Sequence, residues 1–150
     1  MVQKIAVFSG DGIGSEVMAE ATEVLKEVGV RFSMDFSFES ALAGGCSIDE
    51  HGNALTDTAL KIAKESDAVL LGAVGGPKWD QIKIDGGPQD KDGLMRLRQT
   101  LNVYAGLRPA RGHPALIHAT PFREGLAEQA DVMVVRELCG GAFFAQPRGI

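Results

Sequence analysis

The sequence is poor in the residues that cross-link secreted proteins or hold metal ions. Its 150 residues include two cysteines, Cys46 and Cys139, and three histidines. No C-x-x-C pair and no His/Cys spacing typical of zinc occurs, and no D-x-x-x-D pair lies on an expected helix. We therefore expect two reduced cysteines, as in cytosolic proteins, and no metal ligands within this chain.

Long apolar runs and a surplus of basic residues are also missing. No stretch approaches the roughly 20 apolar residues of a membrane-spanning helix, and the start M-V-Q-K-I-A-V-F does not resemble a signal peptide. The net charge of -5 and the isoelectric point near 5.2 argue against a nucleic-acid-binding face. We expect a cytoplasmic protein with neither membrane nor nucleic acid as a partner.

The sequence does contain enough apolar residues for a folded core. Hydrophobic residues make up 45% of the chain, and the length is typical of about one domain. Residues 4–8 form a short apolar run of the kind found in strands buried on both faces. The turn G-D-G-I-G follows at residues 10–14. Helical spacing then predicts a helix over about residues 15–28, with Ser15 as its N-cap.

The rest of the chain continues this alternation of strands and helices. Alternating residues predict an edge strand over 32–38, and Thr56 is expected to cap a helix over 57–66. The other expected elements are a connection over 41–53, a buried strand over 68–74, a helix over 93–100, strands over 103–107 and 132–135, a breaker-rich link between Pro109 and Pro114, and a short helix over 122–129. This order predicts an α/β fold with a largely parallel sheet flanked by helices.

Two segments lie where ligands bind in open α/β sheets. The glycine turn has the spacing G-x-G-x-G, which is not the dinucleotide fingerprint G-x-G-x-x-G. It either contacts a ligand or lets a helix pack close to a strand. Residues 75–91 form a long loop after the carboxyl end of a buried strand, the edge at which such sheets bind ligands. Trp79, the only tryptophan, either anchors this loop or contacts a ligand.

Three arginines, Arg98, Arg108 and Arg136, stand among apolar residues. The planar guanidinium group matches a carboxylate with two parallel hydrogen bonds. A cluster of three such groups would suit a small substrate with more than one carboxylate. The alternative is that each is a surface arginine whose apolar stem lies along the protein.

Taken together, these stretches resemble a known family. The matching residues are G-D-G-I-G-S-E-V at 10–17, L-L-G-A-V-G-G-P-K-W-D at 70–80, L-R-Q-T-L-N-V-Y-A-G-L-R-P-A at 97–110, V-V-R-E-L-C-G-G at 134–141 and P-R-G at 147–149. In this order they resemble the β-decarboxylating dehydrogenases, the isocitrate/isopropylmalate dehydrogenase family. The G-G-P-K-W-D loop favours the isopropylmalate branch.

The resemblance implies a reaction and its cofactors. The family oxidises a 2-hydroxy dicarboxylate at its hydroxyl carbon and passes hydride to NAD. The oxo acid then loses its β-carboxylate while Mg or Mn stabilises the enolate. In the isopropylmalate branch the substrate is 3-isopropylmalate and the product is 4-methyl-2-oxopentanoate, in leucine biosynthesis. The family forms homodimers, so we expect a homo-oligomer or a completing partner chain.

The resemblance also implies site residues. Arg98, Arg108 and Arg136 match the family's substrate-carboxylate-binding arginines. The cofactor side matches Ile13, Gly75, Gly76, Pro77, Lys78 and Trp79.

Three positions depart from the family pattern. The family tyrosine that assists proton transfer is matched by Phe143, which has no hydroxyl group. Lys91 stands where the family often has an acidic residue, and Ser15 replaces a proline. We therefore assign no catalytic residue within this chain.

The family's metal-binding aspartates and proton-relay lysine match no residue of the chain. We expect residues 1–108 to be part of the dinucleotide-side domain and residues 109–150 to begin the dimerisation and substrate domain. Two hypotheses remain. The chain is either the N-terminal part of a dehydrogenase, catalytically incomplete by itself, or a non-catalytic relative that binds a dicarboxylate or pairs with a longer paralogue.

Overall fold

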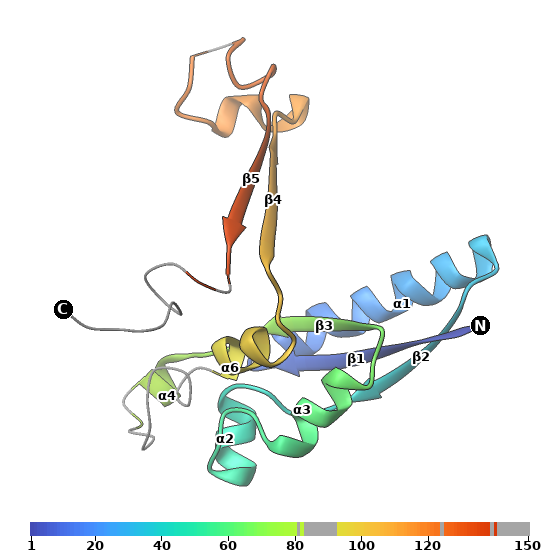
Figure 1. The fold of residues 1–150 in the computed structure, drawn as a ribbon. Coiled ribbons are helices and arrows are strands. Elements are labelled where there is room, and N and C mark those ends of the chain that lie inside the picture. Colours follow the sequence, from blue (N-terminus) through green and yellow to red (C-terminus); the bar gives the residue numbers. More distant parts are fainter. Residues whose placement is uncertain (81, 83–92, 124, 139, 141–150) are drawn as a thin grey trace. The chain divides into compact units, whose positions relative to one another are not determined.

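The computed structural model describes residues 1–80, 82, 93–123, 125–138 and 140 (Figure 1). The chain divides into two units, Met1–Leu101 and Asn102–Ile150, and each is described by itself. The expected boundary at residue 108 concerned the domains of a longer family fold and stays a prediction.

Three parallel strands form the centre of the first unit. They are β1 (Val2–Gly10), β2 (Asp35–Ser40) and β3 (Ala68–Ala73), in the order β2-β1-β3. β1 pairs with β2 through Val2↔Asp35 and with β3 through Phe8↔Leu71. The carboxyl ends of β1 and β3 therefore meet at one edge of the sheet. The expected α/β fold with a parallel sheet is confirmed.

The central strand β1 has side chains buried on both faces. Ala6 and Phe8 are fully buried in a cluster that includes Leu55, Leu60 and Leu97. On the opposite face, β1 contributes to a second cluster built from Ile5, Val7 and Met18. This burial confirms the prediction made from the run I-A-V-F, because only a strand covered on both faces stays apolar at every position.

Helix α1 (Gly14–Phe32) covers one face of the sheet and is longer than predicted. Its N-cap is Ile13 rather than Ser15, whose hydroxyl group donates to the carbonyl of Gly12. The helix packs through Gly14, Met18 and Gly29, whereas Ile13 and Val17 are exposed.

The predicted start of the second strand was wrong, because the helix runs on to Phe32. The chain turns at Ser33, which has a left-handed conformation with φ of 53°, and β2 begins at Asp35.

The other face is covered by α3 (Asp57–Lys64) and α6 (Gly93–Thr100) (Figure 1). The Thr56 hydroxyl oxygen accepts a hydrogen bond from the Ala59 amide at 3.1 Å, so the predicted cap is confirmed. The bounds of α6 are those expected. Helix α2 (Gly45–His51) lies within the expected connection over 41–53 and was not predicted, because its seven residues contain too few apolar positions to show a period.

The second unit contains an antiparallel ribbon of β4 (Ala105–Arg111) and β5 (Asp131–Glu137). The 3-10 helix η1 (Pro114–Ala119) lies in the connection from β4 to β5. The predicted strand end at residue 107 was wrong, because Pro109 is part of β4. A ribbon of two edge strands tolerates proline where its nitrogen faces away from the ladder.

The short helix predicted over 122–129 was also wrong, since the described residues there form turns and bends. The described residues include no helix with both the length and the apolar content needed to cross a bilayer.

Candidate functional site

The glycine turn lies at the carboxyl end of β1, and its three glycines serve different purposes. A Cβ atom at Gly10 would collide with the carbonyl group of Ala73, and one at Gly14 would collide with that of Ser9. These two glycines therefore let the turn and α1 approach the backbone of β3. Gly12 has φ of 52° and open space around it. Close packing thus accounts for Gly10 and Gly14, and a ligand contact remains a prediction for the rest of the turn.

Asp11, in the middle of this turn, is 4% exposed. Its Oδ2 accepts hydrogen bonds from the amides of Gly45 at 2.8 Å and Gly75 at 2.7 Å, and its Oδ1 accepts one from the amide of Cys46 at 2.6 Å. Sequence reasoning missed this residue. The signal available was an acidic residue between two glycines directly after a buried strand.

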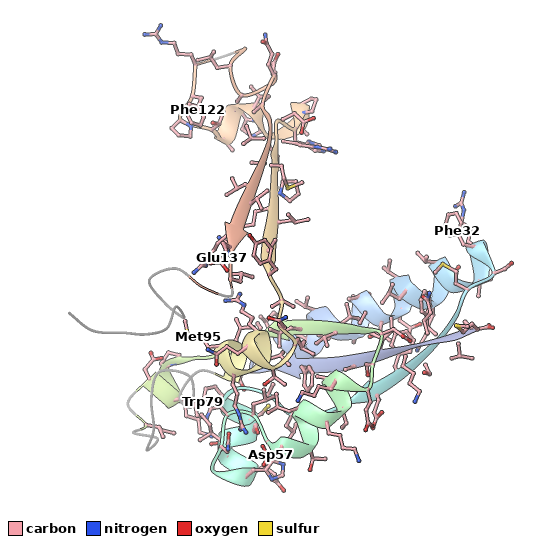
Figure 2. The ribbon with its side chains drawn as sticks, viewed as in Figure 1. Phe32, Asp57, Trp79, Met95, Phe122 and Glu137 are labelled. Atoms are coloured by element: carbon pink, nitrogen blue, oxygen red, sulfur yellow. The ribbon has the colours of Figure 1, made fainter. Side chains whose placement is uncertain are left out.

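The loop after β3 contains α4 (Pro77–Asp80) and is anchored to α2 through Trp79 (Figure 2). The indole ring lies so close to Gly45 that a Cβ atom there would collide with it. The indole Nε1 donates to Oδ1 of Asp49 at 3.1 Å, and Lys78 Nζ lies 2.6 Å from its Oδ2. Trp79 therefore anchors the loop, and its contact with a ligand stays a prediction.

Two titratable groups of α2 have shifted pKa values. The pKa of Asp49 is lowered, first by the hydrogen bond from Lys78 and then by the one from Trp79. The pKa of Cys46 is raised, chiefly by burial, and the nearby Asp11 carboxylate raises it further. Because the thiolate is the reactive form of cysteine, Cys46 is not an activated nucleophile.

A cavity of about 440 Å³ lies between α2, the start of α6 and the loop after β3. Its lining is mostly apolar and includes Leu55, Leu71, Val74 and Leu94, with Asp80 as an acidic side chain at its wall. The backbone of Gly75 also reaches it. A cavity of this size and lining accepts a small, largely apolar group.

The other candidate cofactor-side residues lie around the same edge of the sheet. Ile13 is 59% exposed, Pro77 and Lys78 are exposed, and Gly76 is half-buried. Gly75 is exposed, although its amide is already bonded to Asp11. The structure therefore brings Ile13 and the 75–79 loop to one edge.

The three arginines lie on three elements. Arg98 lies on α6 in the first unit, and its neighbour Arg96 ties that helix to Leu55 and Asp57. Arg108 on β4 and Arg136 on β5 belong to the second unit.

The strand register puts Arg108 and Arg136 together. Arg136 lies opposite Gly106, and Arg108 lies opposite Val134. Because residues two apart in a strand share a face, the two arginines are diagonal neighbours on the same face of the ribbon, roughly 7–8 Å apart at the backbone.

Some candidate positions lie outside the described residues, namely Phe143, Lys91 and the P-R-G turn at 147–149. Among the residues that the structure describes, no group of three or more His, Cys, Asp or Glu side chains is arranged to hold a metal ion.

A scan against protein families matches residues 4–150 to the isocitrate/isopropylmalate dehydrogenase family. The chain therefore belongs to this family. Relatives named 3-isopropylmalate dehydrogenase are 47% identical over 147 residues in Aquifex aeolicus and 51% identical over 149 residues in Anaeromyxobacter dehalogenans. These matches cover 98% and 99% of this chain but 40% and 42% of the relatives. The chain thus spans about two fifths of the length of the curated relatives it matches.

Solved structures agree with this assignment of the fold. A β-decarboxylating dehydrogenase from Thermococcus kodakarensis matches with a TM-score of 0.61 and 31% identity over 90% of this chain and 33% of that one. An isocitrate dehydrogenase from Methylococcus capsulatus matches with a TM-score of 0.66 and 27% identity over 91% of this chain and 34% of that one. The fold is therefore that of part of an isocitrate/isopropylmalate dehydrogenase.

Proposed function

We propose that this chain carries the carboxylate-binding part of a 3-isopropylmalate dehydrogenase. Such an enzyme oxidises the hydroxyl carbon of 3-isopropylmalate with NAD and releases the β-carboxylate as carbon dioxide, forming 4-methyl-2-oxopentanoate in leucine biosynthesis. Family membership and relatives of that name at 47% and 51% identity support the proposal. We infer that the 150 residues do not turn this substrate over by themselves, because the family's metal-binding aspartates and proton-relay lysine match none of them.

The arginine pair of the second unit is the observation that carries this proposal. Arg108 and Arg136 share one face of the β4–β5 ribbon as diagonal neighbours. Their long side chains can converge on a ligand, and each guanidinium group can bind one carboxylate with two hydrogen bonds. A dicarboxylate therefore fits the pair better than a monoacid does. Arg98 on α6, in the first unit, matches a further carboxylate-binding arginine of the family.

The residues at the carboxyl edge of the sheet leave room for a nicotinamide cofactor to reach them. Ile13 and Lys78 are exposed, and the space where a Gly75 side chain would lie is open. When bound, NAD would supply the hydride acceptor. The described residues contain no group of three or more His, Cys, Asp or Glu side chains that could hold Mg or Mn.

A second candidate function is a non-catalytic relative that binds a dicarboxylate or pairs with a longer paralogue. Phe143 favours it, because this phenylalanine stands where the family has a tyrosine that assists proton transfer. Both candidates predict that the 150-residue chain forms no NADH from 3-isopropylmalate, NAD and Mg, as followed at 340 nm. Turnover by the chain alone would contradict its catalytic incompleteness.

The arginine pair is tested by replacing Arg108 with alanine and measuring thermal stability with 3-isopropylmalate. A ligand that binds only the folded state raises the unfolding temperature. Loss of a charge-assisted pair costs about 1.5–3 kcal/mol, so we expect about a 10- to 150-fold weaker apparent affinity in Arg108→Ala.

Arg111→Ala is the matched control for this test. Arg111 lies on the same strand, but on the opposite face, where it pairs with Asp131 at 3.0 Å. We expect this variant to bind the dicarboxylate like the wild type. Equal ligand-induced stabilisation in Arg108→Ala and the wild type would overturn the proposed site.

A further inference from the structure

Asp11 is the one buried charged side chain among the residues that the structure describes. A buried carboxylate is costly unless hydrogen bonds replace its water. Here three backbone amides replace it, and the described residues contribute no cation to an ion pair with it. Such charge-assisted bonds are shorter and stronger than neutral ones. Asp11 has no role in the carboxylate-binding site proposed above.

The three amides come from two segments that are distant from Asp11 in the sequence. Gly45 and Cys46 begin α2, 34 and 35 residues further on, and Gly75 lies just after β3, 64 residues further on. The amide of Asp11 itself donates to the carbonyl of Ala73 at 2.6 Å. One residue thus joins the glycine turn, the end of β3 and the start of α2.

Two glycines make this approach possible. Gly44 and Gly75 have φ of 87° and 98°, a conformation that other residues adopt only with strain. A Cβ atom at Gly44 would lie 2.5 Å from Oδ2 of Asp11. The backbone on both sides of the carboxylate is therefore shaped around it.

A few residues further along, the loop is attached to the same helix again. Trp79 packs on Gly45, and Lys78 and Trp79 both donate to Asp49. Residues 76 and 77 thus lie between two attachments to α2, a buried one at Gly75 through Asp11 and an exposed one at Lys78 and Trp79 through Asp49. A segment held at both ends loses much of its conformational freedom before any ligand arrives.

We propose that Asp11 is a positioning residue for the loop after β3. Its carboxylate fixes Gly75 to the start of α2, so that residues 76–78 keep one conformation at the carboxyl edge of the sheet. The identity of the ligand presented there, the nicotinamide side of the cofactor, rests on the proposed function. The positioning itself does not.

The test is the substitution Asp11→Asn, which keeps the shape of the side chain and removes its charge. In either orientation the new side-chain amide group would turn a donor toward at least one of the three backbone N–H groups. We expect amide exchange at Gly75 to be at least about tenfold faster, and the emission of Trp79 to shift to longer wavelength. Both are read at temperatures where circular dichroism shows a folded protein, so that global unfolding does not contribute.

Asp67→Asn is the matched control, because the Asp67 carboxylate accepts one backbone bond, from Lys4, at the opposite end of the sheet. It should leave the Gly75 and Trp79 signals unchanged. Equal signals in Asp11→Asn and the wild type would overturn the proposal. If Asp11→Asn does not fold, exchange in the wild type decides: a protected Gly75 amide supports the proposal, and one exchanging at the random-coil rate overturns it.

Titration with NAD separates this proposal from the proposed function. Binding that weakens in Asp11→Asn but not in Asp67→Asn supports both. If the wild type itself does not bind NAD, cofactor binding by the 150 residues alone is ruled out, while the Gly75 and Trp79 signals still decide the role of Asp11.

Discussion

The strands β1 and β5 look alike in sequence but differ in their surroundings. The run I-A-V-F of β1 is buried, with Phe8 fully inaccessible. The run V-M-V-V of β5 is exposed, with Val135 at 62%. The difference comes from what packs on each strand, since α1 covers one face of β1 and α3 and α6 cover the other. The described part of the second unit contains no α-helix. An apolar run therefore predicts a strand, but it does not predict whether other elements pack on that strand and bury it.

The largest expected effect is the loss of stability when a buried side chain of β1 is truncated. Phe8→Ala removes a large side chain from the centre of the first core, and such changes cost about 3–5 kcal/mol. Val135→Ala removes methyl groups that are already in water, and exposed substitutions stay within about 0.5 kcal/mol. Urea unfolding followed by circular dichroism measures both. A similar loss in the two variants would break the comparison between the strands.

A smaller difference is expected in amide exchange of the wild type. Regions with few buried contacts open locally, whereas core strands exchange only by global unfolding. We expect the amides of residues 132–135 to exchange about 100-fold faster than those of residues 5–8, as measured by NMR or mass spectrometry. Uniform protection would show that both strands belong to one cooperative unit.

The smallest effect concerns the attachment of the loop to Asp49. The pKa of Asp49 is lowered in the folded state by Lys78 and Trp79. The stabilisation of the fold by these contacts is therefore fully present above the ordinary aspartate pKa of about 3.9. It is lost as the pH falls through the lowered value. We expect Trp79 emission to change in this acid range. Asp49→Asn should show no such change, and an identical titration in that variant would contradict the attachment.

Helices and strands of the first unit were predictable where apolar residues recur at a regular spacing over enough positions. The strand at residues 4–8, the Thr56 cap and the helix over 93–100 follow from apolar spacing and capping chemistry. Helix α2 was not predictable in this way, because G-C-S-I-D-E-H has no apolar period. Its position depends on Asp11 and Trp79, which contact it from distant parts of the chain.

The candidate site was predictable in residue type but not in arrangement. The sequence predicts arginines suited to carboxylates, yet it does not tell whether Arg108 and Arg136 share a face. That depends on the strand register, in which a shift of one residue would put them on opposite faces. Asp11 was missed for a related reason, because its three partners are backbone amides, which carry no residue-type signal.

The position of β1 has a consequence for synthesis. It lies between β2 and β3 in the sheet and is made before both, and its partner β3 begins only at Ala68. Ribosomes add roughly 5–20 residues per second, so several seconds separate the two strands. During that time Ile5–Phe8 has an open edge and an uncovered face. The nascent first unit is therefore a natural client for chaperones that bind short apolar segments as they leave the ribosome.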